Sequence, residues 1–212
     1  MNKPDQNGVL ALWPTNLMQR TLPDADKANP VLATFIEKLD AQSPDITTRY
    51  RQADLLQSEH PAIKWLAQCI NKTVVDYLAA QGQTYESSWA LQGWPNINRF
   101  GDYHDLHNHP HSYLSGTYYV QVPDETEPMP GRADRRPGAI SFYDPRPQAN
   151  MTAIRNDPQI EAEYTVMPRP GMILLWPSFL HHFVHPNLSR KPRISVSFNV
   201  VLNWSDSYLP NQ

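Results

Sequence analysis

The chain has 212 residues and a formal net charge of -3, with 18 Lys and Arg against 21 Asp and Glu. This length suits one domain with a substantial core, so we expect a single domain over residues 1–212. It carries neither a basic stripe for a nucleic-acid backbone nor an apolar run long enough to span a membrane. We therefore expect neither a nucleic acid nor a membrane as a partner. The lone cysteine, Cys69, cannot form an internal disulfide, which favours a reducing compartment, and we expect a cytoplasmic protein.

Two helices are predicted within residues 1–88, as support for a sheet that follows. The first begins at Asn29 and Pro30, since proline suits a first helical turn, and apolar residues then recur at helical spacing. The second follows His60 and Pro61 and ends near Gly82. Its apolar face consists of Ile63, Leu66, Ile70, Val74, Tyr77 and Leu78.

From Trp89 onward the pattern changes to short alternating or apolar runs separated by Pro and Gly. Candidate strands cover residues 90–100, 106–109, 113–122, 138–143, 163–166, 171–176, 182–185 and 193–204. Several short strands joined by turn residues predict a sandwich or jelly roll. We therefore expect a mainly β fold, a double-stranded β-helix of the jelly-roll or cupin type over residues 89–206, with flanking N-terminal helices.

A pair of histidines, His107 and His109, indicates a metal site. Alternate side chains of a strand share a face, so both would point the same way from one strand. A later histidine from another strand would complete a facial site that leaves metal positions open for substrate and oxygen. Asp105 shares their parity and is the alternative ligand, whereas His104 and His111 are expected to be surface or hydrogen-bonded residues.

Arg193 and Ser195 share one face of the last predicted strand. A guanidinium pairs with a carboxylate through two hydrogen bonds, and a hydroxyl two residues further on can donate a third. A metal site beside such an anchor favours a chelating keto acid between them. We expect Asn98 and Asn199 to face the same cavity, whereas Trp94, Trp176 and Trp204 are expected to serve packing.

These motifs resemble those of the iron(II)- and 2-oxoglutarate-dependent oxygenases, and within them a bacterial and phage group with His-x-His in place of His-x-Asp. The resemblance covers nearly the whole chain and is carried by residues 12–17, 101–109, 115–120, 142–146 and 173–186. The last segment is similar to prolyl-hydroxylase-type enzymes, whose distal ligand lies in a His-x-Val-x-Pro context. That context implies His182 as the ligand rather than His181 or His185.

The resemblance implies His107 and His182 as iron ligands and Arg193 as the partner of the far carboxylate of 2-oxoglutarate. Ser195 and Tyr119, the second tyrosine of Tyr118-Tyr119, would assist Arg193, and Asn98 joins the expected cosubstrate residues. The family has Asp or Glu at the position of His109, so the neutral imidazole leaves the site one unit more positive. Halogenating relatives have a small residue there, so the imidazole disfavours halogenation.

The expected function is that of an Fe(II)- and 2-oxoglutarate-dependent oxygenase, a hydroxylase that uses molecular oxygen on a small-molecule or peptide substrate. A homodimer is one of the oligomeric states that we consider. One alternative is a cupin-type three-histidine dioxygenase that binds its substrate directly to iron, with Arg193 holding the carboxylate of that substrate. Another is a jelly roll that binds a metal or ligand without catalysis.

Overall fold

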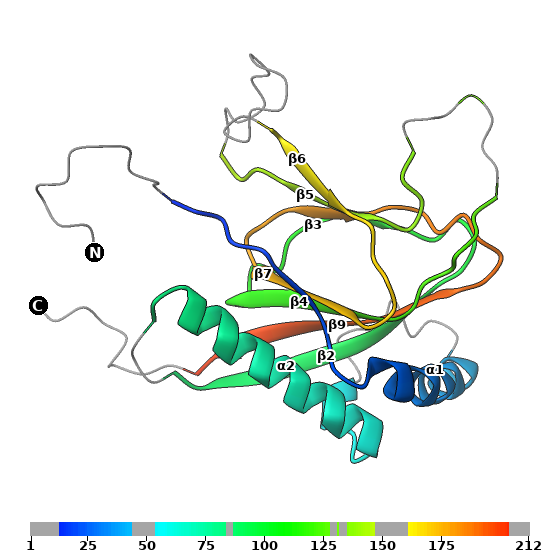
Figure 1. Ribbon diagram of the computed structural model, residues 1–212, viewed down its shortest axis with the longest axis horizontal. Helices are drawn as coiled ribbons and strands as arrows, with labels where there is room; N and C mark the ends of the chain where they lie inside the picture. Colours follow the sequence, from blue (N-terminus) through cyan, green and yellow to red (C-terminus); the bar gives the residue numbers. More distant parts are fainter. Residues whose placement is uncertain are drawn as a thin grey trace, which may run out of the picture.

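The computed structural model describes residues 13–43, 54–83, 87–127, 131, 135–146 and 161–203. Two antiparallel sheets face one another, and both long helices cover the outer face of the larger sheet (Figure 1). The larger sheet has the order β1 (Met18–Thr21), β7 (Met172–Pro177), β4 (Leu114–Gln121), β9 (Arg193–Leu202) and β2 (Trp89–Asn98). The smaller sheet has the order β3 (His104–His107), β8 (His182–Val184), β5 (Ile140–Tyr143) and β6 (Glu163–Val166).

The main hydrophobic core lies between the larger sheet and the helices α1 (Ala25–Gln42) and α2 (Pro61–Ala80). Alternate side chains of β4 and β9 point to this side, among them Tyr118, Val196 and the fully buried Phe198. All six positions of the predicted α2 face are buried. Burying a large apolar side chain contributes roughly 1.5–3 kcal/mol, so this layer holds the helices on the sheet.

The opposite face of the larger sheet looks into the sandwich and is apolar only in part. Near β7 a second cluster joins the sheets, with Leu174 and Trp176 packed on Ile140 and Phe142. Along β2, β9 and β4 most of the inward positions are polar. Since buried polar side chains are unfavourable without partners, this part of the interior is built for something other than packing.

The predicted fold class, mainly β with N-terminal helices, is confirmed. Two details of the elements were wrong. The first helix begins at Ala25 rather than at Asn29, and Pro30 lies inside it. This earlier start was missed because the first turn carries no apolar stripe that a sequence pattern could detect. The strand β1 was not predicted, and it pairs with β7 at the edge of the larger sheet.

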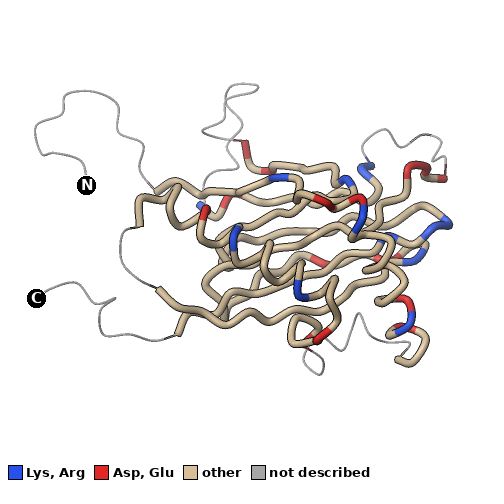
Figure 2. The backbone as a smooth tube through the Cα atoms, turned by 60° about the horizontal axis from the view of Figure 1, so that its bottom comes forward, with Lys and Arg blue, Asp and Glu red and all other residues tan. Residues whose placement is uncertain are grey.

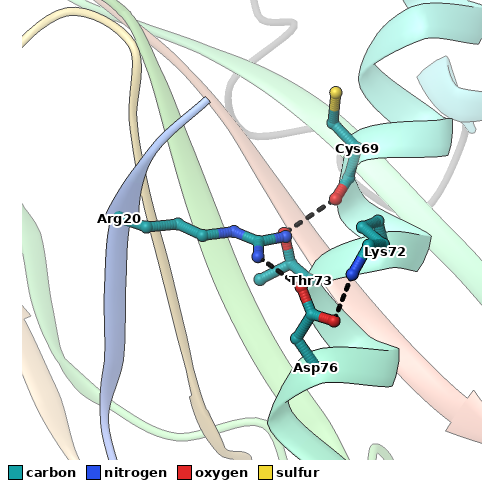
Figure 3. A network of polar contacts seen from close by, with 5 residues as sticks. All are labelled: Arg20, Cys69, Lys72, Thr73 and Asp76. Atoms are coloured by element: carbon teal, nitrogen blue, oxygen red, sulfur yellow. Dashed lines mark hydrogen bonds and ion pairs between the residues drawn. The ribbon is translucent and has the colours of Figure 1, made fainter. Parts of the chain in front are cut away.

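A polar network joins β1 to α2 (Figure 3). Arg20 donates to Asp76 at 2.7 Å and also to the hydroxyl of Thr73, which itself donates to the carbonyl of Cys69 at 2.7 Å. Lys72 donates to the other oxygen of Asp76. The Lys72 and Arg20 side chains hold the pKa of the Asp76 carboxyl below its usual value. The edge strand is thereby tied to the helix that covers it.

The charged residues are mixed over the described surface. Figure 2 shows Lys and Arg positions interspersed with Asp and Glu positions, without one continuous basic face in this view. Among the described residues, no helix combines the length and the apolar content needed to cross a bilayer.

Candidate metal centre and carboxylate pocket

Three histidines converge at one end of the space between the sheets. One ring nitrogen from each of His107, His109 and His182 lies within 4.8 Å of the others. The antiparallel pairing of β3 with β8 sets His107 directly opposite His182, and their ring centroids are 4.2 Å apart. This is the group predicted from the sequence, and it can supply three nitrogen ligands to one face of a metal ion.

The expected reason for the convergence was wrong in one respect. His107 is the last residue of β3, and His109 lies in the segment after it, so the two do not alternate along one strand. The backbone N–H of His109 donates to the carbonyl of Ser178 at 2.9 Å. This contact with the segment after β7 positions the third imidazole.

Two ligand candidates have one ring nitrogen fixed by the backbone. Nδ1 of His107 lies 2.6 Å from the carbonyl oxygen of Asp105, and Nδ1 of His182 lies 3.1 Å from that of Leu180. A carbonyl can only accept, so each Nδ1 carries the proton and each Nε2 is left with a free lone pair. Such a second hydrogen bond orients a metal-binding imidazole.

Two of the histidines, His109 and His182, are held in the neutral form that metals require. Burial lowers the pKa of His182 well below its ordinary value. Burial, with a smaller contribution from His107, lowers the pKa of His109 to about 4. The His109 ring stacks with Trp94 at a centroid distance of 5.9 Å, and Trp176 meets His182 edge-on at 5.0 Å. Three imidazoles in this arrangement fit a divalent transition metal such as Fe(II).

Arg193 lies at the start of β9 and is 2 % exposed. One terminal nitrogen donates to the carbonyl of Gly138 at 3.0 Å, and the other donates to the side-chain oxygen of Asn98 at 2.9 Å. Among the described residues Nε has no hydrogen-bond partner, and no carboxylate there pairs with this guanidinium. Burial lowers the pKa of Arg193. A desolvated cation with a spare donor is a receptor for an anion.

Tyr119 and Ser195 lie beside Arg193, paired with each other across β4 and β9. Both are buried and line the same cavity as Arg193. Burial raises the pKa of Tyr119 to about 12, so its hydroxyl remains a proton donor. Tyr118 points to the helices instead, where its hydroxyl donates to Asn29 at 2.6 Å. Of the two tyrosines, the second therefore faces the cavity.

His104 is a hydrogen-bonded residue, as expected, but its place in the cavity was not predicted. Its Nε2 lies 3.2 Å from Nδ2 of Asn98 and accepts from that amide, so Asn98 contacts both Arg193 and His104. Burial, and then the nearby Arg193, lower the pKa of His104 to about 4. A single histidine gives no signal for this role. His104 and His107 also differ in parity, and only the irregular register of β3 on β8 brings both to the cavity.

The other candidate ligands lie outside the cluster. Asp105 is exposed, and its carboxylate accepts from the backbone N–H of Leu106 at 2.7 Å. His185 is hydrogen bonded to Ser141 at 2.7 Å, and His181 is exposed. None of the three belongs to the histidine group within the described chain.

The histidines and Arg193 share one cavity of about 890 Å³. Trp94 and Trp176 also line it; Trp176 packs in the second core cluster as expected, and a position on the cavity wall was not predicted for either tryptophan. Asn199 lines it as expected, whereas Trp204 lies outside the described residues. A volume of this size is near the upper end for small-molecule sites and exceeds the needs of one small dicarboxylic acid.

A double-stranded β-helix in which three histidines able to hold a metal ion share a cavity with a buried arginine is typical of one class of oxygenase. The family described as "Putative 2OG-Fe(II) oxygenase" matches residues 92–199, which is half of the chain. The chain belongs to this family of 2-oxoglutarate- and Fe(II)-dependent oxygenases, and it is an oxidoreductase. No curated protein matches the chain.

Solved structures agree on the fold. A prolyl-4-hydroxylase from Pseudomonas putida superposes with a TM-score of 0.57 at 16% identity, covering 87% of this chain and 86% of its own. HygX from Streptomyces hygroscopicus, solved with nickel and 2-oxoglutarate bound, gives a TM-score of 0.54 at 15% identity, covering 88% of this chain and 82% of its own. HygX has also been solved with iron bound. At these identities the likeness concerns the fold alone.

Proposed function

We propose that the chain is a hydroxylase in which His107, His109 and His182 hold Fe(II) and Arg193 anchors 2-oxoglutarate. The substrate is a small molecule or a peptide segment that enters the remaining space of the cavity. When bound, the iron supplies the oxidation, in which one oxygen atom of O₂ enters the substrate, the other enters succinate, and CO₂ is released. The protein supplies binding, orientation and exclusion of water.

The observation that carries this proposal is the buried guanidinium of Arg193 without a carboxylate partner in the described chain. Leaving a buried charge uncompensated is strongly unfavourable, so the position calls for an external anion. The far carboxylate of 2-oxoglutarate fits, because Tyr119 and Ser195 can add hydroxyl hydrogen bonds beside the guanidinium. Asn98 holds the guanidinium in place through its 2.9 Å contact.

The neutral third ligand complements this anchor. An imidazole at His109 in place of a carboxylate leaves the metal site more positive, which favours the dianionic keto acid electrostatically. The Nδ1 hydrogen bonds of His107 and His182 keep both rings oriented before any ligand arrives. The chain thus brings two positive centres to one cavity, one for each end of 2-oxoglutarate.

An anaerobic titration of the Fe(II)-loaded protein with 2-oxoglutarate tests the proposal, followed by the visible charge-transfer band of a chelated keto acid. Arg193→Ala removes a charge-assisted contact and is expected to cost roughly 2–5 kcal/mol of cosubstrate binding. Arg193→Lys restores the charge without the planar fork and recovers only part of the loss. Metal content stays unchanged in both variants, because Arg193 is not a ligand.

The cupin-type alternative predicts a different result. A wild-type protein that gives no charge-transfer band, and that consumes oxygen with another acid without releasing succinate, would overturn the proposal. Arg193 would then hold the carboxylate of the substrate itself. A protein that binds metal and consumes no oxygen with any acid would support the non-catalytic alternative.

A further inference from the structure

The inward-facing residues of the larger sheet form ranks, that is, rows of residues paired across neighbouring strands by the strand register. Asn98 lies opposite Arg193, and in the next rank Asn96 and Tyr119 flank Ser195. The two ranks after that contain Trp94, Ser197 and Thr117, then Gln92, Asn199 and Ser115. The first two ranks contain the Arg193 anchor, and we call the six residues of the last two ranks the neutral wall.

The neutral wall is polar but carries no charge. All six of its residues are contributed by β2, β4 and β9, and five of them are among the residues lining the cavity, namely Gln92, Trp94, Thr117, Ser197 and Asn199. The nearby carboxylate of Asp54 also lines the cavity, but it accepts from the backbone N–H of Gly93 at 3.0 Å and of Leu56 at 3.1 Å. Its charge is therefore already stabilised by the protein itself.

Hydrogen bonds within the sheet leave defined donors and acceptors for a ligand. Ser115 donates to the side-chain oxygen of Asn199 at 2.9 Å, which leaves the amide N–H groups of Asn199 free in the described structure. Asn96 donates to Ser197 at 2.9 Å, so the hydroxyl proton of Ser197 remains available. Asn96 is 1 % exposed, and its side-chain oxygen has no hydrogen-bond partner among the described atoms. Buried polar groups of this kind require a partner.

We propose that the neutral wall binds the substrate, and that the bound part is an uncharged molecule that both donates and accepts hydrogen bonds, through hydroxyl or amide groups. The inference rests on the proposed function, since it assigns the space that 2-oxoglutarate leaves in the cavity of about 890 Å³. Where the wall is buried, at Trp94 and Thr117, a carboxylate, phosphate or ammonium group would lose hydration without a partner of opposite charge, which is costly. The wall therefore selects against charged analogues.

The test uses protein loaded with Zn(II) and saturated with 2-oxoglutarate, so that turnover is absent and the Arg193 anchor is filled. Two matched pairs serve as probes: methyl β-glucoside with methyl β-glucuronide, and N-acetylglycinamide with N-acetylglycine. N-acetylethylenediamine adds a cationic probe. Binding is measured by saturation-transfer NMR at millimolar probe concentrations. The uncharged member of at least one pair is expected to bind, at least about tenfold more tightly than its charged counterpart.

Two variants locate the binding on the wall. Asn199→Asp keeps an acceptor for Ser115 but replaces the free amide donor with a negative charge. It is expected to weaken binding of the uncharged probe at least about tenfold and to strengthen binding of the cationic probe. Thr117→Val keeps the shape and removes a buried hydroxyl, with a loss of about three- to tenfold. Asn71→Asp is the control, since Asn71 is exposed on α2 and also accepts a hydrogen bond there, from Trp89 at 2.8 Å.

Equal or tighter binding of the charged probes overturns the inference, and so does the absence of binding by both uncharged probes. Binding that Asn199→Asp and Thr117→Val leave unchanged places the probe elsewhere and also overturns it. The 2-oxoglutarate titration separates the two proposals. If the wild-type protein fails to bind 2-oxoglutarate, the proposed function fails; if it binds 2-oxoglutarate without probe selectivity, only this inference fails.

Discussion

Arg193 and Asn98 lie opposite one another on β9 and β2, and the guanidinium donates to the Asn98 oxygen at 2.9 Å. The amide nitrogen of the same Asn98 lies 3.2 Å from His104 on β3, which belongs to the other sheet. Asn98 therefore links the proposed anion anchor to the strand that carries His107. Its orientation is fixed at both ends of its amide, so it can hold the guanidinium in one position.

Replacing Asn98 is expected to weaken cosubstrate binding without removing the metal. Asn98→Leu deletes a hydrogen bond to a buried charge, which is worth about 1.5–3 kcal/mol, so the affinity for 2-oxoglutarate should fall roughly 10- to 100-fold. Asn98→Asp retains an acceptor for Arg193 but supplies a competing carboxylate, and it should also lower the affinity for 2-oxoglutarate. Anaerobic titration and metal analysis measure both effects. Wild-type affinity in Asn98→Asp would contradict an anion-binding role for Arg193.

The metal site predicts a clear division among single substitutions. His107→Ala, His109→Ala and His182→Ala each remove one of the three proposed ligands and should strongly reduce the iron content of the purified protein. Asp105→Ala and His185→Ala are the controls, since both residues lie outside the cluster and should leave most of the metal bound. Metal content per chain is the measurement. Full iron retention in His109→Ala, with loss in Asp105→Ala, would reverse the assignment of the third ligand.

Most elements could be predicted because their patterns are periodic. The α2 face repeats apolar residues at helical spacing from Ile63 to Leu78, and β9 alternates buried Ile194, Val196 and Phe198 with the inward residues. The strand β1 could not be predicted, because its four residues gain their strand conformation from pairing with β7. Such pairing is a long-range property that a short sequence window does not contain.

The site was predictable in its residues more than in its geometry. Alternation correctly placed Arg193 and Ser195 on one face of β9. It could not place His109, because β3 ends at His107 and the contact with Ser178 decides where the next imidazole lies. Alternation alone also cannot tell whether the inward face of a sheet meets an apolar core or a cavity. For this reason the cavity position of Trp94 was missed.

The buried histidines predict how the metal-free protein responds to acid. The pKa of His104 is lowered to about 4 in the folded protein, against an ordinary value of 6.5. Below pH 6.5 the unfolded chain binds a proton that the folded chain does not, so stability falls as the pH drops from 6.5 toward 4. This lost stability amounts to at most about 3 kcal/mol for His104.

Urea unfolding of the chelator-treated protein at neutral and mildly acidic pH measures this loss. His104→Gln removes the titrating group and leaves an acceptor for Asn98, so its stability should decline less over the same pH interval. His109 keeps its own lowered pKa of about 4 in that variant, so part of the decline remains. An identical decline in wild type and His104→Gln would show that His104 is protonated alike in the folded and unfolded states.

Gly116 predicts a strong packing constraint on β4. A Cβ at this position would lie 2.5 Å from the carbonyl oxygen of Leu174 and would also overlap the ring of Phe198. A backbone oxygen in the middle of a sheet cannot move aside without disturbing strand pairing, so Gly116→Ala should lower the free energy of unfolding by about 2–3 kcal/mol. At Gly93 the nearest atoms belong to the Leu56 side chain, at 2.5 and 2.6 Å, on the short 3-10 helix η1 (Leu55–Gln57). That side chain can shift, so Gly93→Ala should cost less. Urea midpoints of the two variants give the comparison, and a larger loss at Gly93 would contradict this packing argument.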